Sequence, residues 1–225
     1  ASQFFPVHAP NYIDNIINIL ASLHINLVVL RSGDSGVVER AASAEAMPVV
    51  NGGSPDDHPT QALADLYTIH HELGGVDGKT IAVVGRLEHR NVSALLKGLA
   101  MFDDIKLMLV PFSGQVPEEV MSHCVENGVT VQEHRDIDSL SEADAIYLNG
   151  PRTVAHAQLL RSRGSGHLKI DDEFMSRLKD DCIVMDPMQR SGDFSIETQD
   201  SRLAFYRQAE NALFVRMAVI RHVLG

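Results

Sequence analysis

Residues 80–110 read TIAVVGRLEHRNVSALLKGLAMFDDIKLMLV, and this stretch decides the fold class. The apolar runs Thr80–Val84 and Lys106–Val110 have the length of buried strands, and between them Val92–Phe102 repeats apolar residues with the period of a helix. A strand, a helix and a second strand in this order form the unit from which parallel sheets are built. We therefore expect an α/β fold.

The same alternation continues on both sides of this stretch. The further predicted helices cover 11–23, 35–46, 59–73, 117–127, 171–178 and 203–224, and the further predicted strands cover 26–30, 48–51, 130–133, 145–148 and 182–186. Gly and Asp residues at 74–79 are typical of a linker, so we place a boundary between two lobes there. The prediction is two lobes with parallel sheets flanked by helices: residues 1–74, residues 79–202, and a C-terminal helix at 203–225 that packs back on the first lobe.

Composition excludes several classes of protein. The formal net charge is −11, and Arg31 and Arg40 are the only Lys or Arg residues among the first 78, which argues against a nucleic-acid partner. The apolar runs, such as Leu27–Leu30, are too short to span a bilayer. Two cysteines far apart, Cys124 and Cys182, fit a reducing compartment. We expect a cytoplasmic protein that binds neither nucleic acid nor membranes.

The tetrapeptide His58-Pro59-Thr60-Gln61 is the sharpest local motif, because it lies where a strand and a turn lead into a predicted helix. Free backbone N–H groups at a helix start favour an anion, and His58 and Gln61 can donate hydrogen bonds to a polarised carbonyl. Arg31 ends a predicted strand, where it could pair with a phosphate. From local sequence alone, His58 could equally cap the helix, and Arg31 could be an exposed salt-bridge partner.

Two long segments resemble a known family. The first is PVVNGG (48–53) with HPTQALADLYTI (58–69), and the second is FYRQAENALFVRM (205–217). Both are similar to aspartate transcarbamoylase catalytic chains of the aspartate/ornithine carbamoyltransferase family, and the resemblance runs from about residue 11 to residue 225. It implies carbamoyl transfer from carbamoyl phosphate to L-aspartate in pyrimidine biosynthesis by a homotrimer, without a metal, a cofactor or a covalent intermediate.

The resemblance also implies a division of labour between the lobes. Residues 1–74 would be the remainder of a carbamoyl-phosphate-binding domain, in which Arg31, His58 and Gln61 bind carbamoyl phosphate and polarise its carbonyl. The family's Ser-Thr-Arg-Thr phosphate cradle has no counterpart in this sequence. The loop that a neighbouring subunit lends, with its Ser and Lys, aligns with residues 2–10, which contain no Lys and only His8 as a substitute.

The amino-acid-binding domain, residues 79–202, departs further from the family pattern. Gly150 stands where the family has one aspartate-binding Arg, and Asp186 replaces a His. Arg86, Arg90, Arg152 and Arg190 could form a different pocket for an anion, or be surface arginines paired with Glu88 and Asp186. The substrate-binding residues that the resemblance implies here are Arg90, Asn91, Arg152, Pro187, Met188 and Arg190.

Three functions therefore remain open: carbamoyl transfer to L-aspartate, carbamoyl transfer to another amine, and an inactive paralogue. The intact Arg31, His58 and Gln61 favour a protein that uses carbamoyl phosphate. The altered acceptor residues favour either a carbamoyltransferase with another amine acceptor or a catalytically inactive paralogue with a structural or regulatory role.

Overall fold

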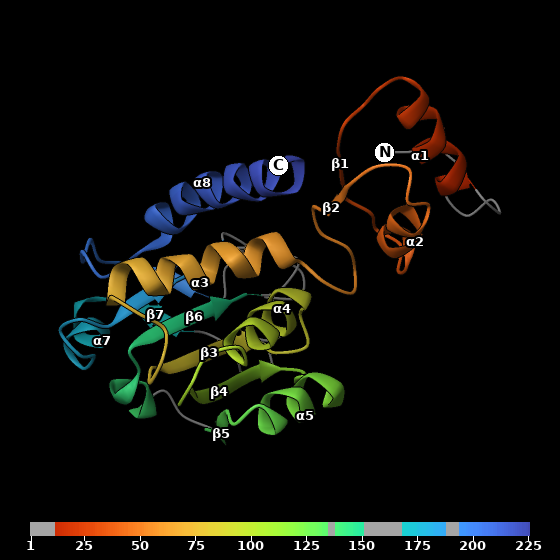
Figure 1. Ribbon diagram of the computed structural model, residues 1–225. Coiled ribbons are helices and arrows are strands. Elements are labelled where there is room, and N and C mark those ends of the chain that lie inside the picture. Colours follow the sequence, from red (N-terminus) through yellow and green to blue (C-terminus); the bar gives the residue numbers. More distant parts are fainter. Residues whose placement is uncertain (1–11, 135–137, 151–167, 188–193) are drawn as a thin grey trace. The chain divides into compact units, whose positions relative to one another are not determined.

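The computed structural model describes residues 12–134, 138–150, 168–187 and 194–225 (Figure 1). The chain forms two compact units, a small unit of Ala1–Thr60 with Phe214–Gly225 and a large unit of Gln61–Leu213. The boundaries fall inside two helices, α3 (Pro59–Leu73) and α8 (Phe205–Leu224). The expected boundary at residues 74–79 stays a prediction.

The small unit contains a short parallel sheet and two helices. Its elements are α1 (Tyr12–Ser22), β1 (Val28–Leu30), α2 (Val37–Ser43) and β2 (Val49–Asn51). The strands pair in parallel with Val28 opposite Val49. Ile13 and Ile17 lie one helical turn apart and pack with Val37 of α2 in a small apolar core. The carboxyl ends of β1 and β2 therefore lie side by side.

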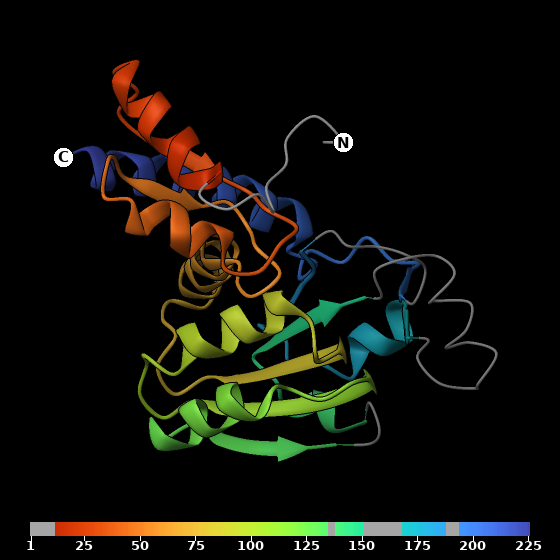
Figure 2. The same cartoon turned by 90° about the vertical axis from the view of Figure 1, so that its right-hand side faces the viewer.

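The large unit is a parallel sheet covered on both faces. Its central strands run in the order β5-β4-β3-β6-β8, and Figure 2 shows their arrowheads at one side. The expected α/β fold is confirmed. After α3, the unit contains β3 (Thr80–Arg86), α4 (Arg90–Leu99), β4 (Lys106–Ser113), α5 (Glu118–Glu126), β5 (Thr130–Glu133), η1 (Asp138–Glu142), β6 (Ala145–Asn149), β7 (Leu168–Ile170), α7 (Asp172–Ser176), β8 (Ile183–Met185), β9 (Phe194–Ile196) and the start of α8.

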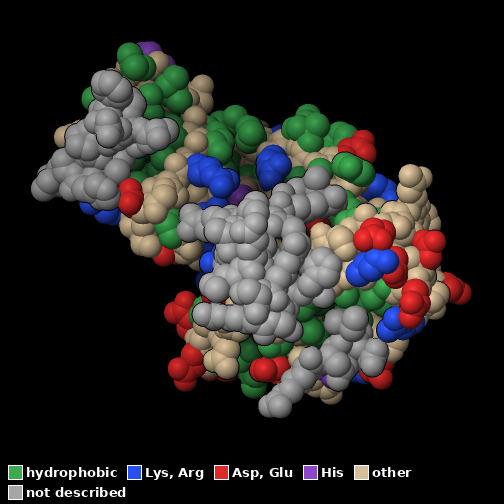
Figure 3. Space-filling view, turned by 180° about the vertical axis from the view of Figure 1, so that it is seen from behind, with side chains coloured by type: hydrophobic (Ala, Val, Ile, Leu, Met, Phe, Trp, Pro, Cys, Tyr) green, Lys and Arg blue, Asp and Glu red, His purple; other side chains and the backbone are tan. Residues whose placement is uncertain are grey.

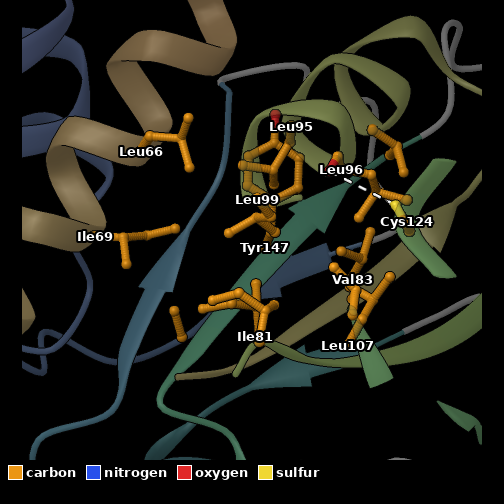
Figure 4. Close-up of a cluster of buried hydrophobic side chains, with 14 of the residues drawn as sticks. Leu66, Ile69, Ile81, Val83, Leu95, Leu96, Leu99, Leu107, Cys124 and Tyr147 are labelled. Carbon is orange, nitrogen blue, oxygen red and sulfur yellow. Dashed lines mark hydrogen bonds between the residues drawn. The ribbon is translucent and has the colours of Figure 1, made fainter. Parts of the chain in front are cut away.

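Alternate residues of β3 and β6 point to opposite faces of this sheet, as the two-residue period of a strand requires. Ile81 and Tyr147 join α3, α4 and α5 on one face, in the cluster that Figure 4 shows with Leu66 and Ile69 of α3. The intervening residues, such as Ala82, belong to a second cluster with α7 and the start of α8. Burial on both faces explains why these strands read as continuous apolar runs.

Beyond shifts in the ends of several elements, two differences from the sequence-based prediction have a clear physical reason. β7 and β9 form a separate parallel pair that was not predicted, because three-residue strands show too little periodicity. α8 begins at Phe205 rather than at residue 203, since Leu203 forms a bridge with Val184 and the amide of Ala204 donates to the Val184 carbonyl at 2.9 Å. The chain thus runs beside β8 before it becomes helical.

Surface and helix properties bear on possible partners. Among the described residues, Figure 3 shows Lys and Arg side chains scattered singly or in small groups over the displayed face, with Asp and Glu side chains among them. None of the helices in the described ranges combines the length and apolar character of a membrane span.

Candidate functional site

Arg31 and the Gly52-Gly53 pair follow β1 and β2, so they lie at the same edge of the small sheet. The Gly52 amide donates to the Leu30 carbonyl at 2.8 Å, and the Ser32 amide donates to the Gly53 carbonyl at 3.2 Å. The Arg31 guanidinium also donates to the Gly52 carbonyl at 3.4 Å. Hydrogen bonds beyond the last strand pair therefore fix the two strand ends against each other.

The turn between β2 and α3 is fixed by its own polar side chains. The buried Ser54 hydroxyl accepts from the Asp57 amide at 3.1 Å, which is a local turn motif. The Asp56 carboxylate accepts from the Ser35 hydroxyl at 2.8 Å and from the Gly36 amide at 3.2 Å. The loop after β1 and the loop after β2 are thus joined, and the second loop leads directly into His58.

Gly53 shows how closely Arg31 and His58 approach each other. A Cβ atom built on Gly53 would lie 3.2 Å from both Cδ2 and Nε2 of His58 and 3.3 Å from Nη1 of Arg31. Its φ of 119° lies in the region that favours glycine. The imidazole and the guanidinium therefore close on one backbone position, where a residue with a side chain would be crowded and strained.

Arg31 and His58 also line one hollow, of about 280 Å³. His58 is only 8% exposed, and its Nδ1 lies 3.5 Å from the Thr60 hydroxyl. Among the described residues, the lining contains no acidic side chain. The lining residues are Val29, Arg31, Val50, Gly52, His58, Thr60, Arg216, Val219 and Ile220.

Arg216 is the functional candidate that the sequence analysis missed. It lines the hollow from α8, as part of the C-terminal segment that belongs to the small unit. Arg216 belongs to FYRQAENALFVRM (205–217), one of the two segments that resemble the family. The sequence signal that could have identified it is a cation within a mostly apolar helix end. A hollow with apolar walls and the charges of Arg31 and Arg216 suits a small anion.

Gln61, the third predicted carbamoyl-phosphate residue, is not among the residues that line this hollow. Its amide nitrogen donates to Oδ1 of Asp65, one turn later in α3, at 2.8 Å. The structure therefore brings Arg31 and His58 together, and the role of Gln61 stays a prediction.

The predicted acceptor residues belong to the large unit, near the carboxyl ends of its strands. Arg86 ends β3, and its backbone carbonyl accepts from the side-chain amide of Asn149, at the end of β6, at 2.7 Å. Nε of Arg86 donates to Glu88 at 2.7 Å. For Arg86, the structure thus shows the ion pair with Glu88 that was one of the two alternatives. Gly85, with a φ of 117°, permits the close approach of the Asn149 carbonyl, which any side chain there would strike.

The start of α4 places the other predicted acceptor residues. The His89 ring accepts from the Asn91 amide at 3.3 Å and caps the helix. Asn91 is only 2% exposed, and Arg90 is half-buried. Pro187 is half-buried and follows the buried Asp186. The predicted residues Arg152, Met188 and Arg190 lie outside the described residues.

A hollow at the carboxyl ends of parallel strands lies where α/β proteins typically bind their ligands. The sequence model of the aspartate/ornithine carbamoyltransferase carbamoyl-P binding domain matches residues 8–71. The model of the Asp/Orn binding domain of the same family matches residues 77–223. The chain belongs to the aspartate/ornithine carbamoyltransferase family, which confirms the resemblance.

Curated relatives and solved structures agree with this membership. A chloroplastic aspartate carbamoyltransferase of Arabidopsis thaliana is 32% identical over 206 residues, which cover 88% of this chain and 53% of the relative. The multifunctional protein CAD of Squalus acanthias is 33% identical over 91% of this chain and 9% of its own length. The chain thus spans about half the length of the plant relative and far less of CAD.

Two solved structures show how far the fold is shared. Aspartate transcarbamoylase from Trypanosoma cruzi in complex with carbamoyl phosphate has a TM-score of 0.83 and 32% identity, over 98% of this chain and 74% of that one. The catalytic subunit of M. jannaschii aspartate transcarbamoylase has a TM-score of 0.82 and 25% identity, over 94% of this chain and 70% of that one. The fold is that of aspartate transcarbamoylase catalytic domains.

Proposed function

We propose that this chain binds carbamoyl phosphate through Arg31, His58 and Arg216 and takes part in carbamoyl transfer to L-aspartate, in pyrimidine biosynthesis. The observation that carries the proposal is the convergence of Arg31 and His58 on Gly53 and on one hollow without acidic lining residues among those described. The dianionic phosphoryl group of an acyl phosphate is suited to guanidinium donors, and the hollow supplies two of them.

The chemistry needs no covalent help from the protein. The acceptor nitrogen forms a bond to the carbamoyl carbon, the bond from that carbon to the phosphate oxygen breaks, and the amine loses a proton as phosphate leaves. Negative charge grows on the carbonyl oxygen during attack, so a donor aimed at that oxygen lowers the barrier. Nδ1 of His58 lies 3.5 Å from the Thr60 hydroxyl; in the tautomer with the proton on Nε2, Nδ1 accepts from this hydroxyl and Nε2–H is the donor, on the side where Arg31 lies.

Gln61 and the residues near the sheet end of the large unit complete the proposal. Arg90, Asn91 and Pro187 would contact the acceptor, together with Arg152, Met188 and Arg190. The side chain of Asn91 is uncharged, and Arg86 is already paired with Glu88. Fewer guanidinium groups are therefore available to bind the two carboxylates of a dicarboxylic acceptor. This observation favours a second candidate, an amine acceptor with fewer negative charges than L-aspartate.

Assembly and compartment follow from the family resemblance. The proposal includes a homotrimer, because the family completes its site with a loop from a neighbouring subunit. It also includes the cytoplasm, although the Arabidopsis relative is chloroplastic. Light scattering with mass determination tests the trimer, and a monomer at micromolar concentration contradicts it.

Calorimetry with freshly dissolved carbamoyl phosphate tests the binding step on the purified chain. Arg31→Ala and His58→Ala should each weaken binding at least about tenfold, which corresponds to about 1.4 kcal/mol for one charged hydrogen bond. The matched control is Arg40→Ala, since Arg40 is in the same unit but pairs with Asp14 at 3.1 Å. Equal affinities for all four proteins would refute the proposed site, and no binding by the wild type would favour the inactive paralogue.

A radiolabelled carbamoyl assay with a panel of amino acids then identifies the acceptor. Incorporation into L-aspartate alone supports the main proposal, and incorporation into another amine supports the second candidate. Binding of carbamoyl phosphate without transfer to any member of the panel would leave a binding protein and refute the transferase.

A further inference from the structure

Asp65 is a fully buried carboxylate in the middle of α3, with 0% exposure. A carboxylate removed from water is costly unless hydrogen-bond donors replace the lost solvent. Oδ1 of Asp65 accepts from the side-chain amide of Gln61 at 2.8 Å and from that of Gln208, in α8, at 2.7 Å. All three residues lie in the large unit, so this cluster is internal to one compact body.

Tyr147 of β6 lies against the same carboxylate. Burial raises the pKa of Tyr147 well above 10, and the nearby charges of Asp65 and Asp186 act in the same direction. The phenol therefore keeps its proton. Two side-chain amides, from α3 and from α8, donate to one buried carboxyl oxygen, which fixes the position of that group in the fold.

Gln208 extends the cluster to the end of a strand. Its side-chain oxygen accepts from the backbone amide of Asp186 at 2.8 Å, directly after β8. A continuous chain of hydrogen bonds thus runs from Gln61 through Asp65 and Gln208 to Asp186. Pro187, one of the predicted substrate-binding residues, is the next residue along the backbone.

We infer that Asp65 is a positioning residue that sets the orientation of the Gln61 amide and, through Gln208, the position of the backbone at Asp186. Because Oδ1 of Asp65 accepts from the side-chain nitrogen of Gln61, that nitrogen faces Asp65 and the amide oxygen of Gln61 faces away. Asp65 touches no substrate in this assignment. The functional part of the inference rests on the proposed function, because it assumes that Gln61 and Pro187 contact substrate.

The first variant for the test is Asp65→Asn, which keeps the size of the side chain but turns one acceptor oxygen into a donor. We expect the KM for carbamoyl phosphate, or its calorimetric Kd, to rise at least about tenfold. The control is Asn211→Ala, which removes a different hydrogen bond between α8 and α3, from Asn211 to the Thr68 hydroxyl at 3.1 Å. It should leave the affinity for carbamoyl phosphate within about twofold, since it leaves the Gln61 contact in place.

A measurement on the wild-type protein keeps the inference testable if the variant does not fold. In a ¹⁵N-labelled sample, the side-chain NH₂ of Gln61 should exchange its protons with solvent at least about tenfold more slowly than an exposed glutamine amide, because Asp65 holds one of them. Exchange as fast as that of an exposed glutamine would overturn the inference. This readout does not depend on carbamoyl phosphate, so failure of the proposed function is seen separately, as an absence of binding by the wild type.

The exchange rate of the Gln61 amide and the affinities of the variants together decide whether Asp65 is a positioning residue. Slow exchange in the wild type and a tenfold loss of affinity in Asp65→Asn but not in Asn211→Ala support the positioning role. An Asp65→Asn protein with wild-type affinity, or equal losses of affinity in both variants, would show that Asp65 serves only the stability of the helix pair and would overturn the positioning role.

Discussion

Arg207 and Glu72 form a two-point ion pair that joins α8 to α3 within the large unit. Nε of Arg207 lies 2.8 Å from Oε1 of Glu72, and Nη2 lies 2.8 Å from Oε2. The hydrogen bond to Glu72 raises the pKa of Arg207. Paired donors and acceptors in one plane make this geometry stronger than a single-point surface contact.

Replacing Glu72 by Gln should therefore lower the free energy of unfolding by about 1 kcal/mol, at the upper end for a partly exposed pair. Urea denaturation at low and high salt measures the change, and the difference between the two proteins should shrink in high salt because the pair is screened. Glu210→Gln removes one negative charge from an exposed position of α8 and is the control. Equal effects of the two substitutions would contradict a specific role for the pair.

Asp144 gives the large unit a stability that depends on pH. Burial acts to raise its pKa, but hydrogen bonds from Lys179 at 2.6 Å and from the Thr80 amide at 2.7 Å outweigh burial, so the pKa is lowered from 3.8. A carboxyl group with a lowered pKa in the folded state stabilises the protein above its unfolded pKa. That stabilisation is lost as the pH falls through the folded pKa.

Asp144→Asn should therefore lower the free energy of unfolding by about 1.5 kcal/mol near neutral pH, as expected for hydrogen bonds to a charged group. The difference in the free energy of unfolding between wild type and variant should become smaller as the pH falls below 3.8. Urea titrations at a series of pH values measure this difference. Asp181→Asn is the control, because Asp181 is exposed and lies just before β8. A loss of stability in Asp144→Asn that does not change with pH would contradict the lowered pKa of Asp144.

Much of the fold could be predicted from the sequence because the signals were local. The α3 helix matches its predicted range, since Pro59 marks its start and the Gly74-Gly75 pair follows its end. β5 likewise has its predicted bounds at residues 130–133. The pair β7 and β9 could not be predicted, because their pairing joins residues near 168 to residues near 194.

The candidate site also contains some residues whose place could be predicted from the sequence and others whose place could not. The sequence predicted one anion pocket for Arg31, His58 and Gln61; Arg31 and His58 line one hollow, because they follow neighbouring parallel strands, but Gln61 is not among its lining residues. Arg216 could not be assigned in this way, since its place in the hollow depends on the return of the last twelve residues to the small unit. The Arg86–Glu88 pair was left open by the sequence because spacing alone does not decide between an ion pair and a ligand contact.

The two cysteines should be chemically inert in the folded protein. Burial raises the pKa of Cys124, and burial raises the pKa of Cys182 to about 12 against the opposing charge of Arg202. Both are buried free thiols, so at about pH 8 the thiolate that reacts with alkylating agents is scarce and shielded. Iodoacetamide followed by mass determination should show no label on the native chain and two labels after unfolding in urea. Rapid labelling of the native chain would contradict the burial of these thiols.

Gly53→Ala tests the geometry of the hollow without removing a charged group. The new methyl group would lie 3.2 Å from the His58 ring and 3.3 Å from the Arg31 guanidinium, at a φ of 119° that alanine rarely adopts. The strain should cost about 1–3 kcal/mol of stability, and the displaced side chains should bind carbamoyl phosphate at least about tenfold more weakly. Gly33→Ala is the matched control, because a Cβ there meets nothing within 4 Å. Thermal unfolding and calorimetry on both variants measure the two effects. Wild-type affinity in Gly53→Ala would mean that the imidazole and the guanidinium do not close on the ligand at this position.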